Sequence, residues 1–162
     1  MLNIITAPNK SLRKRSVEID HNFLLSANTQ QLIAEMIPAM YNDNGIGLAA
    51  PQVNHNIRLL IIGKEAINKN HNLAGQDLIL INPIWEKTSR KTGWDTEGCL
   101  SVPKIYGKVK RYKNIYVKAW DQDGNELKFK ATDFFACVIQ HEVDHLDGIL
   151  FIDKAKDIYE VE

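Results

Sequence analysis

The chain has 162 residues, of which 44% are hydrophobic and 25% are charged, and its 20 basic side chains balance 20 acidic ones. This size and composition are typical of one globular domain with a buried core, so we expect a single domain over residues 1–162. The zero net charge disfavours a direct nucleic-acid function, and no apolar stretch approaches the ~20 residues that span a bilayer, so we expect no membrane association.

The first predicted element is a helix over residues 29–40, where apolar side chains recur at helical spacing. Ser26 or Asn28 can cap its start, and Pro38 is expected to kink or break it because proline lacks a backbone donor. Small residues dominate the segment that follows, 45–53, which suits a place where a substrate backbone lies against the protein backbone. Within that segment, Gln52 is either a surface polar residue or an amide that hydrogen-bonds a substrate oxygen.

Buried strands are predicted over residues 57–62 and 78–81, the second closed by Asn82-Pro83, with a polar loop between them. Residues 115–120 and 126–130 flank an Asp-Gly turn, which predicts a β-hairpin. Before this hairpin lies a group of basic residues, which we interpret as the solvated face of a strand pair. The group consists of Lys104, Lys108, Lys110, Arg111 and Lys113.

The segment Gln140–Gly148 contains His-Glu-x-x-His, the most informative pattern in the chain. Residues four apart share one face of a helix, so His141 and His145 can offer two imidazoles to one metal ion, with Glu142 as general base. Apolar residues from Phe134 onward precede the motif, which favours a buried helix over a surface helix with two solvated histidines. Thr132 or Asp133 can cap the start of this helix, and Gly148 marks its end. The predicted fold is α+β, with an N-terminal helix and mostly antiparallel β-sheets packed around a central metal-binding helix.

Catalytic zinc-type sites usually take three protein ligands and leave one position for water, so a third ligand is required. The candidates are Glu97, Asp95, Cys99, His55 and His71. Cys99 offers a soft thiolate beside the flexible Gly98, although a lone cysteine is more often a small buried hydrophobe. Cys137 can line a pocket but is not expected to be a ligand. Two cysteines make no disulfide framework, so we expect a reducing cytoplasm.

Three segments, GIGLAAPQ, EGCLS and QHEVDHLDG, stand in the order and approximate spacing of the signature motifs of the peptide deformylase family, which this chain resembles from its first helix to Gly148. The resemblance implies that Cys99, His141 and His145 hold one divalent metal ion. Fe²⁺ is the implied physiological ion, and Zn²⁺, Ni²⁺ or Co²⁺ are implied substitutes. The implied reaction is hydrolysis of the N-formyl group from the N-terminal methionine of newly synthesised polypeptides, releasing formate.

The resemblance also implies site roles. Glu142 is the implied general base, and the Gln52 side chain and the Leu100 N–H are the implied oxyanion donors. Substrate binding is assigned to Gly45, Ile46, Gly47, Leu48, Gly98, Cys137 and Val138. A Glu97–Arg111 pair is expected, and Asp144 is either a partner of a metal-bound histidine or a solvated helix residue. Tyr106 stands where some members place a basic substrate-contacting residue.

The implied partners are N-formylmethionyl nascent polypeptides. The protein is expected to act on them as a monomer in the cytoplasm. The ribosome near its exit tunnel is a further candidate partner, although the sequence lacks most of the longer C-terminal helix of many bacterial members. The main alternative is a catalytically weak, deformylase-like metal- or peptide-binding protein, which predicts loss of a ligand, Glu142 or Gln52. A His-Glu-x-x-His endopeptidase would leave Cys99 without a function, and a nucleic-acid-binding module predicts salt-dependent RNA binding.

Overall fold

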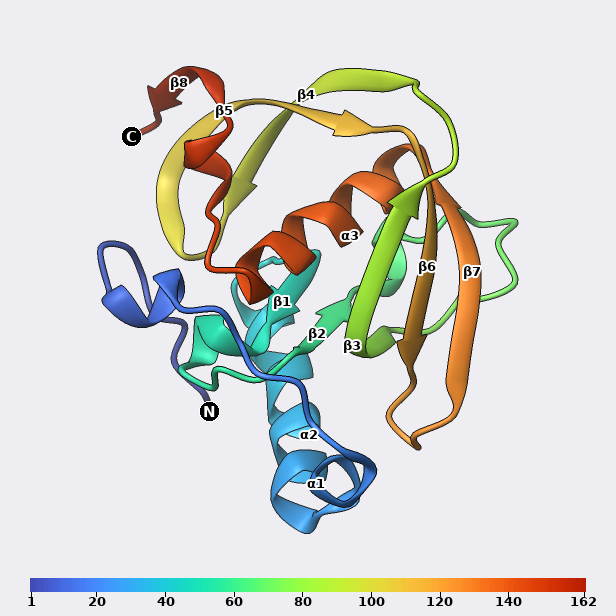
Figure 1. The fold of residues 1–162 in the computed structure, drawn as a ribbon. Coiled ribbons are helices and arrows are strands. Elements are labelled where there is room, and N and C mark those ends of the chain that lie inside the picture. The colour runs from blue at the N-terminus through green and yellow to red at the C-terminus, as the bar shows by residue number, and fades with distance from the viewer.

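The His-Glu-x-x-His segment lies on α3 (Asp133–Leu146), which is held between two antiparallel sheets in the computed structural model of residues 1–162 (Figure 1). One sheet has the strand order β1-β2-β3-β6-β7, formed by Gly47–Ala49, Leu59–Ile62, Leu78–Lys87, Asn114–Trp120 and Glu126–Thr132. The other has the order β4-β5-β8, formed by Thr92–Cys99, Val102–Tyr112 and Lys156–Glu160. The α+β architecture around a central helix agrees with the prediction.

Two α-helices and four short 3₁₀ helices complete the fold. The α-helices are α1 (His21–Leu25) and α2 (Ala27–Asn42). The 3₁₀ helices are η1 (Lys10–Arg13), η2 (Ala50–Val53), η3 (Lys64–Ala66) and η4 (Phe151–Asp153). No helix of the structure is long and apolar enough to cross a membrane.

The five-stranded sheet is buried on both faces at β2, which explains why this strand is a continuous apolar run. Leu60 and Ile62 belong to the core cluster that contains the apolar face of α3. Leu59 and Ile61 belong to the second cluster, which contains α2. Alternate side chains of β2 therefore anchor a helix on each face of the sheet. This packing fixes the distance of α3 from β1 and β2.

The helix α2 starts as expected, because the Ser26 side chain accepts a hydrogen bond from Thr29 N. The expectation that Pro38 breaks it is wrong: the helix continues to Asn42. Pro38 and Ala34, whose carbonyl would accept the missing N–H, are both exposed. Water can therefore hydrate that carbonyl, so the lost hydrogen bond is not left in the core.

The expected end of the second buried strand at Asn82-Pro83 is also wrong, because β3 runs on to Lys87. The register shifts between Ile81 and Ile84, and Asn82 has a positive φ of 50°. This irregularity takes the proline out of the ladder, so the strand resumes after it. The predicted hairpin is confirmed as β6 and β7, with Gly124 at a positive φ of 85°.

The end of α3 is held from outside the helix. Leu146 is its last residue, and Gly148 follows with φ of +74°. The Arg58 guanidinium donates to the Leu146 carbonyl at 3.0 Å and to the Asp147 carboxylate at 3.0 Å. A cation at a helix C-terminus also interacts favourably with the helix dipole. The end of α3 nearer His145 is therefore tied to Arg58, the residue that directly precedes β2.

Candidate metal centre and active site

Cys99, His141 and His145 meet between the end of β4 and the side of α3 that carries the two histidines. Their ligand atoms all lie within 4.8 Å of one another, and Cys99 Sγ is 3.3 Å from His145 Nε2. Of the five candidates for a third ligand, Cys99 is the one that joins the two histidines. One thiolate and two imidazoles form a donor set that suits Zn²⁺, Fe²⁺, Co²⁺ or Ni²⁺.

Burial and hydrogen bonds set which ligand atoms the two histidines can offer. His141 Nδ1 lies 2.8 Å from Glu97 Oε1, which leaves Nε2 as the ligand atom. Burial acts to raise the pKa of Glu97, but hydrogen bonds from Arg111 and His141 outweigh it and lower the pKa to about 2. Burial lowers the pKa of His145 well below its ordinary value, so this imidazole is neutral and able to donate a lone pair. The residues present therefore fit the implied ion.

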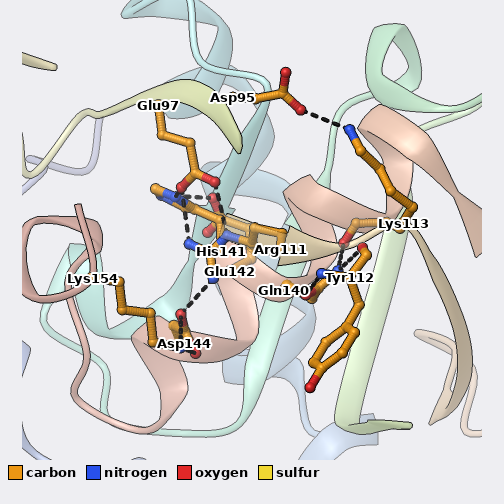
Figure 2. A network of polar contacts seen from close by, with 11 residues as sticks. Asp95, Glu97, Arg111, Tyr112, Lys113, Gln140, His141, Glu142, Asp144 and Lys154 are labelled. Carbon is orange, nitrogen blue, oxygen red and sulfur yellow. Dashed lines mark hydrogen bonds and ion pairs between the residues drawn. The ribbon is translucent and has the colours of Figure 1, made fainter. Parts of the chain in front are cut away.

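Arg111 is the centre of the polar network behind His141 (Figure 2). Its guanidinium binds Glu97 through Nε at 2.8 Å and Nη2 at 2.9 Å, and it donates to Asp144 through Nη1 at 2.8 Å. Lys154 reaches the same Asp144 carboxylate at 3.0 Å. The expected Glu97–Arg111 pair is present in the structure.

Two expectations about this network need correction. Arg111 is only 4% exposed, so it does not belong to the solvated face that was predicted for the basic group. Lys104, Lys108 and Lys110, in contrast, are exposed. Asp144 is 8% exposed and paired with Arg111, so the reading as a solvated helix residue is wrong. A carboxylate on each side is what makes a buried guanidinium tolerable in this place.

The side chain of Glu142 lies beside the candidate metal ligands. It is 4% exposed, and its Oε2 has no hydrogen-bond partner in the protein. Burial raises the pKa of Glu142 to about 7. A Cβ on Gly47 would lie only 2.8 Å from Glu142 Oε1, so the glycine leaves room for this side chain. A buried carboxylate with one free oxygen and a pKa near neutrality is suited to proton transfer.

Gln52 is buried, at 1% exposure, so the surface-polar interpretation is wrong. Its Oε1 accepts a hydrogen bond from Ala49 N at 2.9 Å, which fixes the amide orientation. Its Nε2 lies 3.1 Å from Ser101 Oγ and 3.6 Å from Cys99 Sγ. One amide hydrogen therefore binds Ser101, and the other faces the metal centre. The neighbouring Leu100 N–H donates to no backbone carbonyl, so it also remains available.

A cavity of about 1060 Å³ opens at these residues. Its lining includes Gly45, Ile46, Gly47, Gly98, Cys137 and Val138, all named from the sequence as substrate-binding candidates. Leu48 is different, because its side chain is fully buried in the cluster around α2 and does not reach the cavity. Phe134 was expected in the core but is 56% exposed and lines the cavity.

The sequence reasoning missed several residues of the site. The N-terminal segment contributes Asn3, Ile4 and Thr6 to the cavity wall, and no motif in that segment points to such a role. Backbone bonds from Ile5 N to Gln52 O and from Ala7 N to Ser101 O place it there. The sequence also assigns no role to Ser101. Its place directly after Leu100, a candidate oxyanion donor, is the one signal that could have indicated a role.

The comparisons with known proteins agree with this geometry. The family model for polypeptide deformylase matches residues 1–160. A peptide deformylase of Syntrophomonas wolfei is 41% identical over 154 residues, which cover 94% of this chain and 91% of that protein. Peptide deformylase 2 of Vibrio cholerae is 42% identical over 154 residues, covering 94% of this chain and 85% of that protein.

Solved structures give the same result. The crystal structure of peptide deformylase from Thermotoga maritima aligns with a TM-score of 0.84 at 32% identity, covering 96% of this chain and 98% of that one. A peptide deformylase from Synechococcus elongatus, crystallised with actinonin, aligns with a TM-score of 0.83 at 33% identity, covering 96% and 79%.

Fold and site together define a metal-dependent hydrolase with a possible Cys/His/His metal centre. The chain belongs to the polypeptide deformylase family, whose members are metallohydrolases that act on N-formylmethionyl peptides. The resemblance stated from the three sequence motifs is therefore confirmed.

Proposed function

We propose that this protein, as a single catalytic domain over residues 1–162, removes the N-formyl group from the N-terminal methionine of newly synthesised polypeptides and releases formate. The observation that carries the proposal is the buried Glu142 carboxylate, whose Oε2 has no hydrogen-bond partner, beside the Cys99, His141 and His145 cluster, with Gln52 Nε2 directed at the same point. The printed names of the relatives support the same activity.

A divalent ion bound by Cys99, His141 and His145 supplies Lewis-acid chemistry, which polarises a carbonyl and makes a water molecule more acidic. Fe²⁺ is the proposed native ion, with Zn²⁺, Ni²⁺ or Co²⁺ as substitutes. Glu142 is the proposed general base: its carboxylate accepts the proton of the attacking water and passes it to the amine nitrogen as the formyl C–N bond breaks. The low exposure of Glu142 keeps bulk water from competing for that proton.

Gln52 and Leu100 are the proposed donors to the oxygen of the formyl group. That oxygen gains negative charge as the carbon becomes tetrahedral, and donors held in place beforehand stabilise it without reorganisation. The bond from Ala49 N to Gln52 Oε1 holds the amide in one orientation, with its NH₂ group toward the cavity. Ser101 is proposed to position Gln52 by accepting the second amide hydrogen.

The peptide is proposed to bind along β1, which is the edge strand of the five-stranded sheet and pairs only with β2. Gly45, Ile46 and Gly47 then offer backbone groups to the substrate, as in recognition by an added strand. Ile46, Cys137 and Val138 are proposed walls for the methionine side chain. A formyl group is small, so a tight site is expected to exclude an acetyl group.

N-formylmethionyl nascent chains are the proposed substrate. The protein is proposed to act on them as a monomer in the cytoplasm, with the ribosome near its exit tunnel as a further proposed partner.

The test is formate release from an N-formylmethionyl dipeptide by protein loaded with Fe²⁺ or Ni²⁺ without oxygen. We expect turnover of the formyl peptide, none of the N-acetyl peptide, and a loss of at least about 10²-fold in Glu142→Gln. Metal content measured on each preparation separates a failed site from a failed reaction. Metal-loaded protein that releases no formate would refute the proposal and leave the metal- or peptide-binding alternative. Cleavage inside an unformylated peptide would favour an endopeptidase.

A further inference from the structure

A chain of charged contacts runs from the protein surface to His141, and Lys154 is its outer end (Figure 2). The Lys154 ammonium lies 3.0 Å from Asp144 Oδ2, and the same carboxylate accepts a hydrogen bond from Arg111. Arg111 donates twice to Glu97, which binds His141 Nδ1. The side chain of Lys154 is 44% exposed, whereas the other four are at most 12% exposed. The chain therefore connects a solvated lysine to a candidate metal ligand.

The charges of these side chains balance only when Lys154 is included. Glu97 and Asp144 contribute two negative charges, and Arg111 contributes one positive charge. Lys154 supplies the second positive charge, while His141 is neutral when it binds a metal ion. Without Lys154, the two carboxylates share one guanidinium in a place where little water screens them. We expect Asp144 then to compete with Glu97 for Arg111, which loosens the contact that orients His141.

The short helix η4, which directly precedes Lys154, holds the lysine in this place. Phe151 of η4 is 1% exposed, and its ring stacks on the His141 ring with centroids 6.2 Å apart and planes inclined by 25°. The Asp153 carboxylate accepts a hydrogen bond from the first backbone N–H of this turn at 3.0 Å and also binds the Arg13 guanidinium. The segment is therefore anchored beside the candidate ligand, and the ion pair of Lys154 does not depend on ordering a mobile segment.

We propose that Lys154 is a positioning residue for the candidate metal ligand His141. By neutralising Asp144, it leaves Arg111 bound to Glu97. Glu97 then holds the imidazole in the orientation that a metal ion requires. This inference rests on the proposed function, because it assigns a further residue to the same site.

The main test is Co²⁺ affinity, measured by competition with a chromophoric chelator. Coulomb forces alone predict that loss of a positive charge near the site strengthens binding of a divalent cation. Loss of positioning predicts the opposite sign. We expect Lys154→Met to bind Co²⁺ about 3- to 10-fold more weakly, a smaller loss than for a direct partner of a ligand. Lys154→Arg keeps the charge and should retain the wild-type affinity.

The visible spectrum of the Co²⁺-loaded protein is a second readout, because the ligand-field bands depend on the geometry of the ligands. Lys154→Met should change these bands, and Lys154→Arg should not. Formate release at saturating metal should show a lower kcat in Lys154→Met. KM should stay within about twofold of the wild type, because Lys154 does not line the cavity and cannot contact the peptide there.

Lys156→Met is the matched control. Lys156 is an exposed lysine two residues further along the chain, and its ammonium lies over the Trp94 ring, 4.7 Å from the centroid. The control should keep the wild-type affinity, spectrum and kcat. Thermal unfolding of each metal-free variant identifies any variant whose fold is less stable.

A double-substitution cycle identifies the route of the effect. If Lys154 acts through Asp144, adding Lys154→Met to Asp144→Asn should not weaken Co²⁺ binding further. Additive losses would overturn the proposal, as would unchanged or tighter Co²⁺ binding by Lys154→Met alone. Affinity and spectra require no deformylation. The expected order of affinities in a protein that releases no formate would therefore support the positioning role and refute only the reaction.

Discussion

At the scale of single residues, the site depends on charges that are buried because they are paired. Arg111 lies 4% exposed between Glu97 and Asp144, and Glu97 in turn orients His141. The sequence predicted the first pair through the family resemblance. It did not predict that Asp144 would complete the network, because that contact joins a helix to a strand 33 positions away in the chain.

Arg111→Ala is expected to destabilise the fold by about 3–5 kcal/mol, since two buried carboxylates lose their partner. Metal affinity should also fall about 10- to 100-fold, because Glu97 no longer holds the His141 ring. Chemical denaturation and metal titration measure the two effects. Lys128→Ala, which removes the exposed pair with Glu126, is the control and should change stability by less than about 1 kcal/mol. Equal effects of the two substitutions would contradict the proposed positioning of His141.

Gln52→Leu removes the proposed oxyanion donor with little change of volume. We expect the variant to retain its metal and to lose about 10²-fold or more in kcat. Ser101→Ala keeps the amide but removes its partner, so a smaller loss is expected. Metal content and steady-state rates are the measurements. Near-normal turnover by Gln52→Leu would remove Gln52 from this role.

Tyr41 provides a test of pH dependence away from the metal. Burial and a hydrogen bond to the Asp77 carboxylate raise the pKa of Tyr41 to about 12. The unfolded phenol ionises near its ordinary pKa of about 10, so this contact stabilises the fold fully below that pH. The contribution is lost as the pH rises from about 10 to about 12.

Ultraviolet titration of tyrosinate should reveal one of the five tyrosines ionising near pH 12 in the folded protein. Tyr41→Phe should remove that late step and the alkaline loss of stability that belongs to it. An unchanged titration curve in Tyr41→Phe would assign the late step to another tyrosine.

At the scale of elements, the strongest periodic signals predicted α2, α3, β2 and the β6–β7 hairpin. Their apolar residues recur at the spacing of one buried face, and this spacing is visible among neighbours in the sequence. The sequence did not define β4, β5 or β8, which carry many charged residues and, in β4 and β5, glycines. Cross-strand pairing between distant segments forms these strands, and local propensity does not report it.

The junction after α3 gives an element-scale prediction. Gly148 has φ of +74°, and an added Cβ would lie 2.3 Å from the Arg13 carbonyl oxygen. Gly148→Ala should therefore destabilise the protein by about 2–4 kcal/mol, from left-handed strain and overpacking together. Gly75→Ala is the matched control: φ is +92°, but nothing lies within 4 Å of an added Cβ. It should show the conformational cost alone, measured as the difference in free energy of unfolding.

If both glycine variants lose the same stability, the contact with Arg13 does not hold the end of α3. In that case the backbone conformation alone would account for Gly148. Activity of Gly148→Ala at a temperature where it remains folded tests whether the position of His145 depends on this junction.

At the scale of the whole molecule, the candidate metal centre joins the two sheets. Cys99 belongs to the three-stranded sheet, and the histidines belong to α3, which packs on the five-stranded sheet (Figure 1). An ion bound by all three residues should link these parts and stabilise the folded state over the unfolded one.

Removal of metal with a chelator is therefore expected to lower Tm. Free ion at about 1,000 times Kd stabilises by about 4 kcal/mol, which corresponds to ~10 °C for a domain of this size. Scanning calorimetry with and without Ni²⁺ measures the shift. His145→Ala should abolish it, whereas an equal shift in that variant would place the stabilising ion elsewhere.

The sequence by itself determined the family, the reaction class, the α+β architecture and the candidate ligands. These follow from short motifs whose chemistry requires particular residues at close spacing. Tertiary structure decided the continuation of α2 through Pro38, the burial of Arg111 and Asp144, and the position of the N-terminal segment in the cavity wall. It also decided that the ring of Tyr159 on β8 stacks on the ring of Tyr106 on β5. Each of these depends on which distant surface covers a residue, and one-dimensional spacing does not contain that information.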